Sequence, residues 1–117
     1  MSASSFHGDW LDLGPIDQVP PRGARSIPVA GGEEIALFRT GDDRFYALVN
    51  KCPHKGGPLS QGIVHGDQVA CPLHNWRISL ATGRAQGPDT GCVPTIPVRL
   101  VAGRVLIARA AVVKAAA

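Results

Sequence analysis

The sequence has few aromatic residues, few cysteines and no long apolar segment. Its 117 residues include three Phe, two Trp and one Tyr, so a core would be built mainly from Val, Ile, Leu and Ala. Three Cys is an odd number, which argues against a closed disulfide framework. No stretch approaches the roughly 18 apolar residues needed to cross a bilayer. Residues 1–9 do not combine a basic patch with an apolar run, so we expect no signal peptide and a cytoplasmic protein without a membrane partner.

A concentrated charge of one sign is also lacking. Twelve Lys and Arg against nine Asp and Glu give a net charge of +3. The basic residues are scattered, and aromatic residues do not interleave with them as they do on many nucleic-acid-binding surfaces. We therefore expect no nucleic-acid partner. Paired carboxylates, a Ser/His/Asp set and a phosphate-binding Gly loop are absent from the sequence, so we expect no catalytic residues.

Glycine and proline, by contrast, are abundant: 14 Gly and 10 Pro. This much turn-forming composition is atypical of a helical bundle, and alternating segments recur about every ten residues, which favours an all-β antiparallel sandwich or barrel. We expect one domain over residues 1–117, with a frayed Ala-rich tail at 110–117. The predicted strands are 9–13, 26–29 (an edge strand), 34–39, 44–50, 68–71, 77–80, 95–101 and 104–108. Turn-forming residues 40–43 and 102–103 predict two hairpins, one between 34–39 and 44–50 and one between 95–101 and 104–108.

Two short segments concentrate the chemistry. One is C-P-H-K-G-G-P-L, from Cys52 to Leu59, and the other is C-P-L-H-N-W, from Cys71 to Trp76. Sixteen residues, 55–70, separate the His of the first segment from the Cys of the second. Each segment follows a predicted strand and offers one thiolate and one imidazole, with a Pro that stiffens the backbone directly after the Cys.

Two metals are compatible with two thiolates and two imidazoles. A tetrahedral zinc ion takes such ligands, but zinc sites usually pair Cys with Cys and His with His at wider spacing than C-x-H. In the alternative, both Cys bind one iron and both His bind a second iron, with sulfides bridging the two. Neighbouring ligands then hold different atoms, so the close C-x-H spacing becomes natural.

The two segments together resemble the ligand loops of the Rieske [2Fe–2S] family, and the resemblance extends over residues 27–107. It implies a Rieske-type iron–sulfur fold: a small antiparallel β-sandwich or barrel with a cluster-binding subdomain over residues 51–91. It also implies one [2Fe–2S] cluster per chain. One iron would be bound by Cys52 and Cys71, and the other by His54 and His74.

The charge of such a centre is consistent with electron transfer at a raised potential. Two ferric ions, two sulfides and two thiolates sum to zero, so adding an electron is easier than in a four-Cys cluster. High-potential members carry an extra disulfide between the loops and hydroxyls that donate to the sulfides. Gly57 and Leu73 stand here at the positions of the two disulfide cysteines, and the second loop has Asn75 and Trp76 in place of the hydroxyl residues. We therefore expect a midpoint at the low end of the Rieske range of roughly −150 to +300 mV.

Two groups of small Rieske proteins fit this description. The stretches 35–39, 56–76 and 80–98 look most like the small subunit of assimilatory NAD(P)H-dependent nitrite reductase, which reduces nitrite to ammonia in nitrate assimilation. That resemblance implies an electron-transfer subunit of an oxidoreductase, partnered by a large flavin- and sirohaem-containing subunit. The alternative is the ferredoxin of a ring-hydroxylating dioxygenase, partnered by a flavoprotein reductase and a terminal oxygenase.

The residues around the predicted ligands receive simpler interpretations. We expect Cys92 to be a small apolar filler and His65 to lie in a solvated loop. We expect Trp76 to pack beneath its loop. The loop over residues 86–91 resembles the Pro-containing segment that covers a Rieske cluster. The cations that flank the ligands could steer an acidic partner or simply be solvated: Lys51, Lys55 and Arg77.

Overall fold

A computed structural model describes residues 10–28, 34–52, 57–71, 77–86 and 91–108. The remaining segments include the predicted ligands His54 and His74 and the Ala-rich tail, so the predictions that concern them lie outside the described residues. Within the described ranges, no helix is long and apolar enough to cross a membrane.

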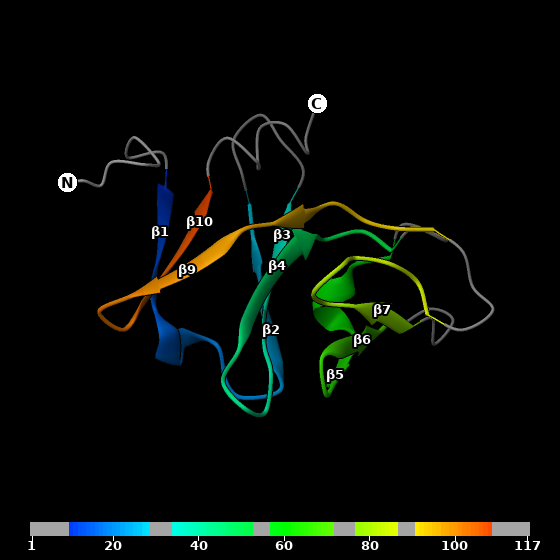
Figure 1. The fold of residues 1–117 in the computed structure, drawn as a ribbon, viewed down its shortest axis with the longest axis horizontal. Coiled ribbons are helices and arrows are strands. Elements are labelled where there is room, and N and C mark those ends of the chain that lie inside the picture. The colour runs from blue at the N-terminus through cyan, green and yellow to red at the C-terminus, as the bar shows by residue number, and fades with distance from the viewer. Residues whose placement is uncertain (1–9, 29–33, 53–56, 72–76, 87–90, 109–117) are drawn as a thin grey trace.

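The described chain forms three antiparallel sheets, side by side in Figure 1. The first has the order β1-β10-β9, and its strands are Trp10–Pro15, Arg104–Ala108 and Val98–Val101. The second has the order β2-β3-β4-β8, with Gly23–Ile27, Ile35–Arg39, Phe45–Val49 and Thr95–Ile96. The third has the order β5-β6-β7, with Ile63–His65, Gln68–Ala70 and Arg77–Ser79. Two 3-10 turns complete the described elements, η2 (Ile16–Gln18) and η3 (Leu59–Gln61).

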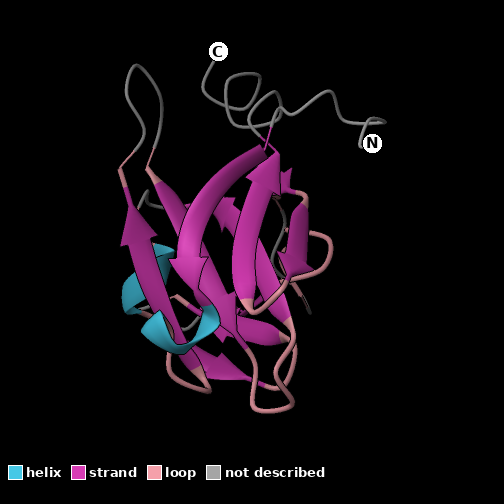
Figure 2. Cartoon of the chain, turned by 90° about the vertical axis from the view of Figure 1, so that its left-hand side faces the viewer, coloured by secondary structure: helices cyan, strands magenta, loops and turns pink. Residues whose placement is uncertain are grey.

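One hydrophobic cluster joins all three sheets. Its centre is β3, in which Ile35 through Phe38 are each at most 1% exposed, so both faces of this strand are covered. Val105 and Ile107 reach the cluster from the first sheet, and Val69 and Ile78 reach it from the third. Figure 2, turned by 90° from Figure 1, shows the strands of the sheets arranged around a common interior. The prediction of an all-β antiparallel fold with an aliphatic core is confirmed.

The predicted hairpins are confirmed in detail. β3 and β4 pair from Ile35↔Val49 to Arg39↔Phe45, and the turn between them is closed by the Thr40 N–H, which donates to the Arg44 carbonyl at 2.8 Å. β9 and β10 pair across the turn at Ala102 and Gly103, both of which have positive φ. These turns could be predicted because polar and Gly residues there interrupt the alternation of apolar side chains.

Three strand predictions need correction. β2 begins at Gly23, earlier than predicted, although it is an edge strand as expected. β5 was missed, and His65 ends this strand rather than lying in a loop, although its side chain is exposed as expected. The strand predicted over 95–101 is divided by Pro97 into β8 and β9, which belong to different sheets. Proline has no N–H to donate, so Pro97 ends the pairing of β8 with the second sheet. Its carbonyl accepts a hydrogen bond from the Ala108 N–H at 3.1 Å, in the first sheet, so the chain changes sheet at this residue.

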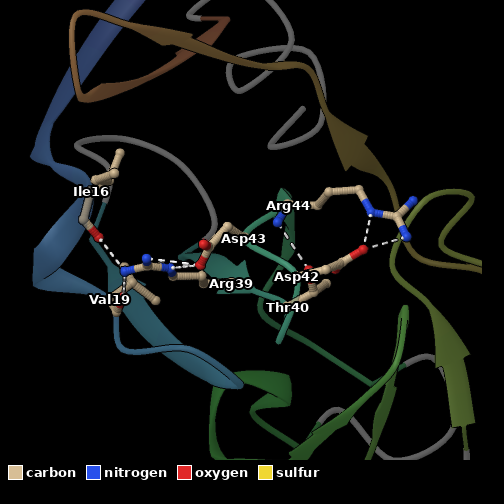
Figure 3. Close-up of polar contacts among 7 residues, drawn as sticks. All are labelled: Ile16, Val19, Arg39, Thr40, Asp42, Asp43 and Arg44. Atoms are coloured by element: carbon tan, nitrogen blue, oxygen red, sulfur yellow. Dashed lines mark hydrogen bonds and ion pairs between the residues drawn. The ribbon is translucent and has the colours of Figure 1, made fainter.

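Arg39 ties the turn η2 to the second sheet (Figure 3). Its guanidinium donates to the carbonyls of Ile16 and Val19, at 3.3 and 2.9 Å, and pairs with Asp43 at 2.8 Å. It also lies over the Phe45 ring, 5.4 Å from the centroid. Only 14% of the Arg39 side chain is exposed. These bonds satisfy backbone carbonyls that the irregular segment between β1 and β2 leaves outside any ladder.

We expect Arg39→Met to lower the free energy of unfolding by about 1–3 kcal/mol, because two carbonyls lose a charged donor. Arg44→Met is the matched control, since its ion pair with Asp42 joins two exposed side chains and should contribute little. Urea denaturation of both cluster-loaded variants measures the difference. Equal midpoints for the two variants would show that Arg39 does not anchor η2.

Candidate metal centre

Two of the predicted ligands, Cys52 and Cys71, are buried at the ends of strands. Cys52 follows β4 and is 3% exposed, and Cys71 follows β6 and is 1% exposed. Both belong to the hydrophobic cluster that joins the sheets. The chain's three cysteines are all described, and each is a thiol rather than half of a disulfide. Two buried thiols, supplied by separate loops, are donors of the kind that hold one iron of a [2Fe–2S] cluster.

Gly57 turns the chain back toward Cys52 after the first ligand loop. The Cys52 N–H donates to the Gly57 carbonyl at 2.8 Å, and Gly57 is itself buried. Pro58 then leads into η3, where Leu59 is fully buried. The backbone on both sides of residues 53–56 is therefore fixed by a hydrogen bond and a core contact. Gly57 stands where high-potential members have a disulfide cysteine, and its carbonyl accepts the hydrogen bond that closes this loop.

Gly62 brings the end of the first loop against the strand that carries the second. A Cβ at this position would lie 2.2 Å from the Ala70 carbonyl oxygen and 3.0 Å from a methyl group of Val69. Ala70 directly precedes Cys71, and it pairs with Ile63 across β5 and β6. The φ of Gly62 is −80°, so close packing rather than an unusual backbone conformation requires glycine here. Sequence analysis missed this residue because a single Gly gives no signal of the backbone opposite it.

Gly83 holds a third segment, around Val93, against the turn that follows β7. The Val93 N–H donates to the Gly83 carbonyl at 2.8 Å, and a Cβ on Gly83 would lie 2.1 Å from the Val93 oxygen. The Ala85 N–H donates to the Gly91 carbonyl at 2.9 Å, so both ends of the predicted covering loop are close together. Residues 87–90 of that loop lie outside the described residues.

Cys92 is not the buried filler that was expected. It is exposed, and it forms an isolated β-bridge with Arg84 next to Gly91. The neighbouring Val93 takes the buried position instead, at 5% exposed. An apolar alternation in a loop of irregular backbone does not show which of two adjacent residues faces inward.

Of the other predicted site residues, two lie on the surface and the rest lie outside the described residues. Lys51 and Arg77, on either side of the cysteine loops, are exposed. The imidazoles His54 and His74, together with Lys55 and Trp76, lie outside the described residues. The described ranges therefore contain two of the four predicted ligands, and in those ranges no group of three His, Cys, Asp or Glu side chains gathers around a metal-sized site.

Comparison with known proteins settles the family. A model of the Rieske [2Fe–2S] domain matches residues 9–97. The chain belongs to the Rieske [2Fe–2S] domain family. A Rieske-type [2Fe–2S] cluster is its cofactor, and the buried thiols of Cys52 and Cys71 fit that cofactor.

Three similar proteins place this Rieske chain among small electron carriers. It is 39% identical over 98 residues to the anthranilate 1,2-dioxygenase ferredoxin subunit of Burkholderia cepacia, covering 83% of this chain and 89% of the relative. The ferredoxin-bearing structure of a carbazole 1,9a-dioxygenase complex matches with TM-score 0.79 at 29% identity, covering 86% and 94%. A chain assigned as an NADH-dependent nitrite reductase small subunit from Mycobacterium tuberculosis matches with TM-score 0.77 at 28% identity, also covering 86% and 94%.

These comparisons confirm the Rieske electron-transfer class and leave the narrower expectation of nitrite reductase unconfirmed. That expectation depended on the stretches 35–39, 56–76 and 80–98. Residues 56, 72–76 and 87–90 of these stretches, Trp76 among them, lie outside the described residues.

We expect Gly62→Ala to reduce the stability of this Rieske chain by about 1–3 kcal/mol and to lower its cluster content, because the new methyl group meets a backbone oxygen. Gly66→Asn is the control: Gly66 has φ +61°, which Asn tolerates, and open space around it. Iron per chain and urea midpoints would be measured for both. A Gly62→Ala protein with full iron content and an unchanged midpoint would contradict the close approach.

Proposed function

We propose that the protein is the Rieske ferredoxin component of a ring-hydroxylating oxygenase system. It would accept one electron from a flavoprotein reductase and pass it to a terminal oxygenase, with one iron cycling between ferric and ferrous. The observation that carries this proposal is the 39% identity, over most of both chains, to a dioxygenase ferredoxin subunit. The likeness to a dioxygenase complex containing a ferredoxin supports it.

In this proposal, Cys52 and Cys71 hold one iron, and His54 and His74 hold the other. With bridging sulfides, four such ligands fill the coordination of both irons, so substrate has no open position and the chain acts only as an electron carrier. The burial of both thiols supports Cys52 and Cys71 as ligands, because it shields them from water and from competing metals.

The small subunit of an NAD(P)H-dependent nitrite reductase is the second candidate. The similar fold of a chain with that assignment, at TM-score 0.77, favours it. So does the stretch L-A-T-G-R-A-Q-G-P-D-T-G-C-V-P-T-I-P-V over residues 80–98. In that role the chain would be a bound subunit beside a flavin- and sirohaem-containing protein rather than a diffusing carrier.

The ligand set is tested by single substitutions. We expect Cys52→Ser, Cys71→Ser, His54→Ala and His74→Ala each to abolish the Rieske visible and EPR spectra, because each removes one bond to iron. Cys92→Ser is the matched control and should keep both spectra, since Cys92 is exposed. Retention of a full spectrum by any of the four ligand variants would show that the assignment of that residue is wrong.

The two functions are separated by their partners. For a dioxygenase ferredoxin, we expect the reduced protein to be reoxidised rapidly by a terminal oxygenase from the same organism, as followed by stopped-flow absorbance. We expect it to elute alone in gel filtration. Affinity purification of the native protein is the complementary measurement. A sirohaem protein recovered in equal amount, with nitrite-dependent NAD(P)H oxidation that requires this chain, would overturn the first proposal and support the second.

A further inference from the structure

Asn50 is a buried amide at the start of the first ligand loop. It is 8% exposed, directly follows β4 and precedes Cys52 by two positions. Its backbone N–H donates to the Glu34 carbonyl at 2.8 Å, which extends the pairing of β3 and β4 beyond their last strand residues. A buried Asn side chain has two donors and an acceptor to satisfy, so its partners show what it holds in place.

The Asn50 side chain forms two hydrogen bonds with Ser60. The amide Nδ2 donates to Ser60 Oγ at 2.9 Å, and the Ser60 backbone N–H donates to the amide Oδ1 at 2.7 Å. Ser60 lies in η3, the turn that follows the loop. The two bonds therefore join the residues on either side of the segment that contains Cys52. The bond from Cys52 N–H to the Gly57 carbonyl closes the same segment from inside.

Glu34 fixes which way the amide faces. Its Oε1 accepts a hydrogen bond from Asn50 Nδ2 at 2.8 Å. Hydrogen bonds from Ser26 and Asn50 lower the pKa of Glu34, so it is a carboxylate at neutral pH. A carboxylate accepts and cannot donate, so the NH₂ of Asn50 must face Glu34, and its oxygen is left for the Ser60 N–H.

Thr40 provides a comparison at the opposite end of the same hairpin. Thr40 and Asn50 are the two buried polar residues of the described chain. Thr40 lies in the turn between β3 and β4, where its hydroxyl donates to Asp42 and accepts from Arg44 N at 2.9 Å. In Figure 1 this turn is at the lower end of the hairpin, whereas the upper end of β4 leads toward the third sheet. If Asn50 only satisfied the core, removing either side chain would have the same kind of effect.

We infer that Asn50 is a positioning residue, which clamps the two ends of the first ligand loop through Ser60 and thereby holds Cys52 in place on the cluster. This inference rests on the proposed ligand set, but it is independent of which partner the protein serves. When the ends separate, the Cys52–iron bond is exposed to water and to competing ligands. The clamp keeps that opening rare.

The test is the rate at which the purified, cluster-loaded protein bleaches in excess EDTA. We expect Asn50→Ala to bleach on the order of tenfold faster than wild type, because two loop-closing hydrogen bonds are lost. Ser60→Ala, which keeps its backbone N–H, should lie between the two and serves if Asn50→Ala does not fold. Thr40→Val is the matched control and should bleach at the wild-type rate, even if its urea midpoint falls.

A charge swap provides the specific rescue. Asn50→Asp alone places a second carboxylate against Glu34 and should bleach faster than wild type. The double variant Asn50→Asp/Glu34→Gln restores a donor between these positions and should return toward the wild-type rate. EPR of the reduced protein adds a readout at the cluster: lines should broaden in Asn50→Ala and keep their width in Thr40→Val.

Two results would overturn the clamp. One is Asn50→Ala bleaching no faster than Thr40→Val, and the other is a double variant that bleaches as fast as Asn50→Asp alone. Either result, in a protein whose Cys52→Ser variant loses its cluster, removes the clamp and leaves the ligand set intact. Retention of the cluster by Cys52→Ser would instead remove the ligand set, and the clamp with it.

Discussion

The close approach of Gly62 to the Ala70 carbonyl is the constraint on which the arrangement of the two cysteine loops depends. A side chain at Gly62 would overlap that oxygen, so only glycine lets the exit of the first loop lie against the strand that enters the second. Gly83 serves the third segment in the same way, against the Val93 carbonyl. Backbone contact at Gly62 therefore sets how the segment after the first loop approaches β6, the strand that leads into Cys71.

The described chain combines three sheets around one core with two loops that begin at the buried Cys52 and Cys71. β3, covered on both faces, joins the first two sheets to the third through a single aliphatic core. Polar side chains at the edge of that core hold neighbouring segments by hydrogen bonds. Arg39 holds η2, and Asn50 joins the start of the first ligand loop to η3. The ion pairs Arg44–Asp42 and Arg104–Asp12 join exposed side chains and add little by comparison.

The Rieske family and the redox partner are determined by different parts of the molecule. The ligand motif indicates which cofactor the chain binds but not which partner it serves. Both a dioxygenase ferredoxin and a chain assigned as a nitrite reductase small subunit are similar to this chain. A partner is chosen by the shape and charge of a docking surface, which involves side chains scattered along the sequence. This explains why the motif led correctly to an electron carrier, while the resemblance over residues 80–98 favoured a partner that the comparisons support less strongly.

The sequence by itself determined the all-β class, both tight hairpins and the residues of the cluster motif, because alternation, turn chemistry and Cys/His spacing are local properties. Tertiary structure decided the rest. Pro97 transfers the chain from β8 to β9, and Val93 rather than Cys92 faces inward. Asn50 contacts Glu34 and Ser60 because the hairpin and η3 pack against each other. Each of these outcomes depends on which backbone or side chain lies opposite in space, and such pairings leave no local signal.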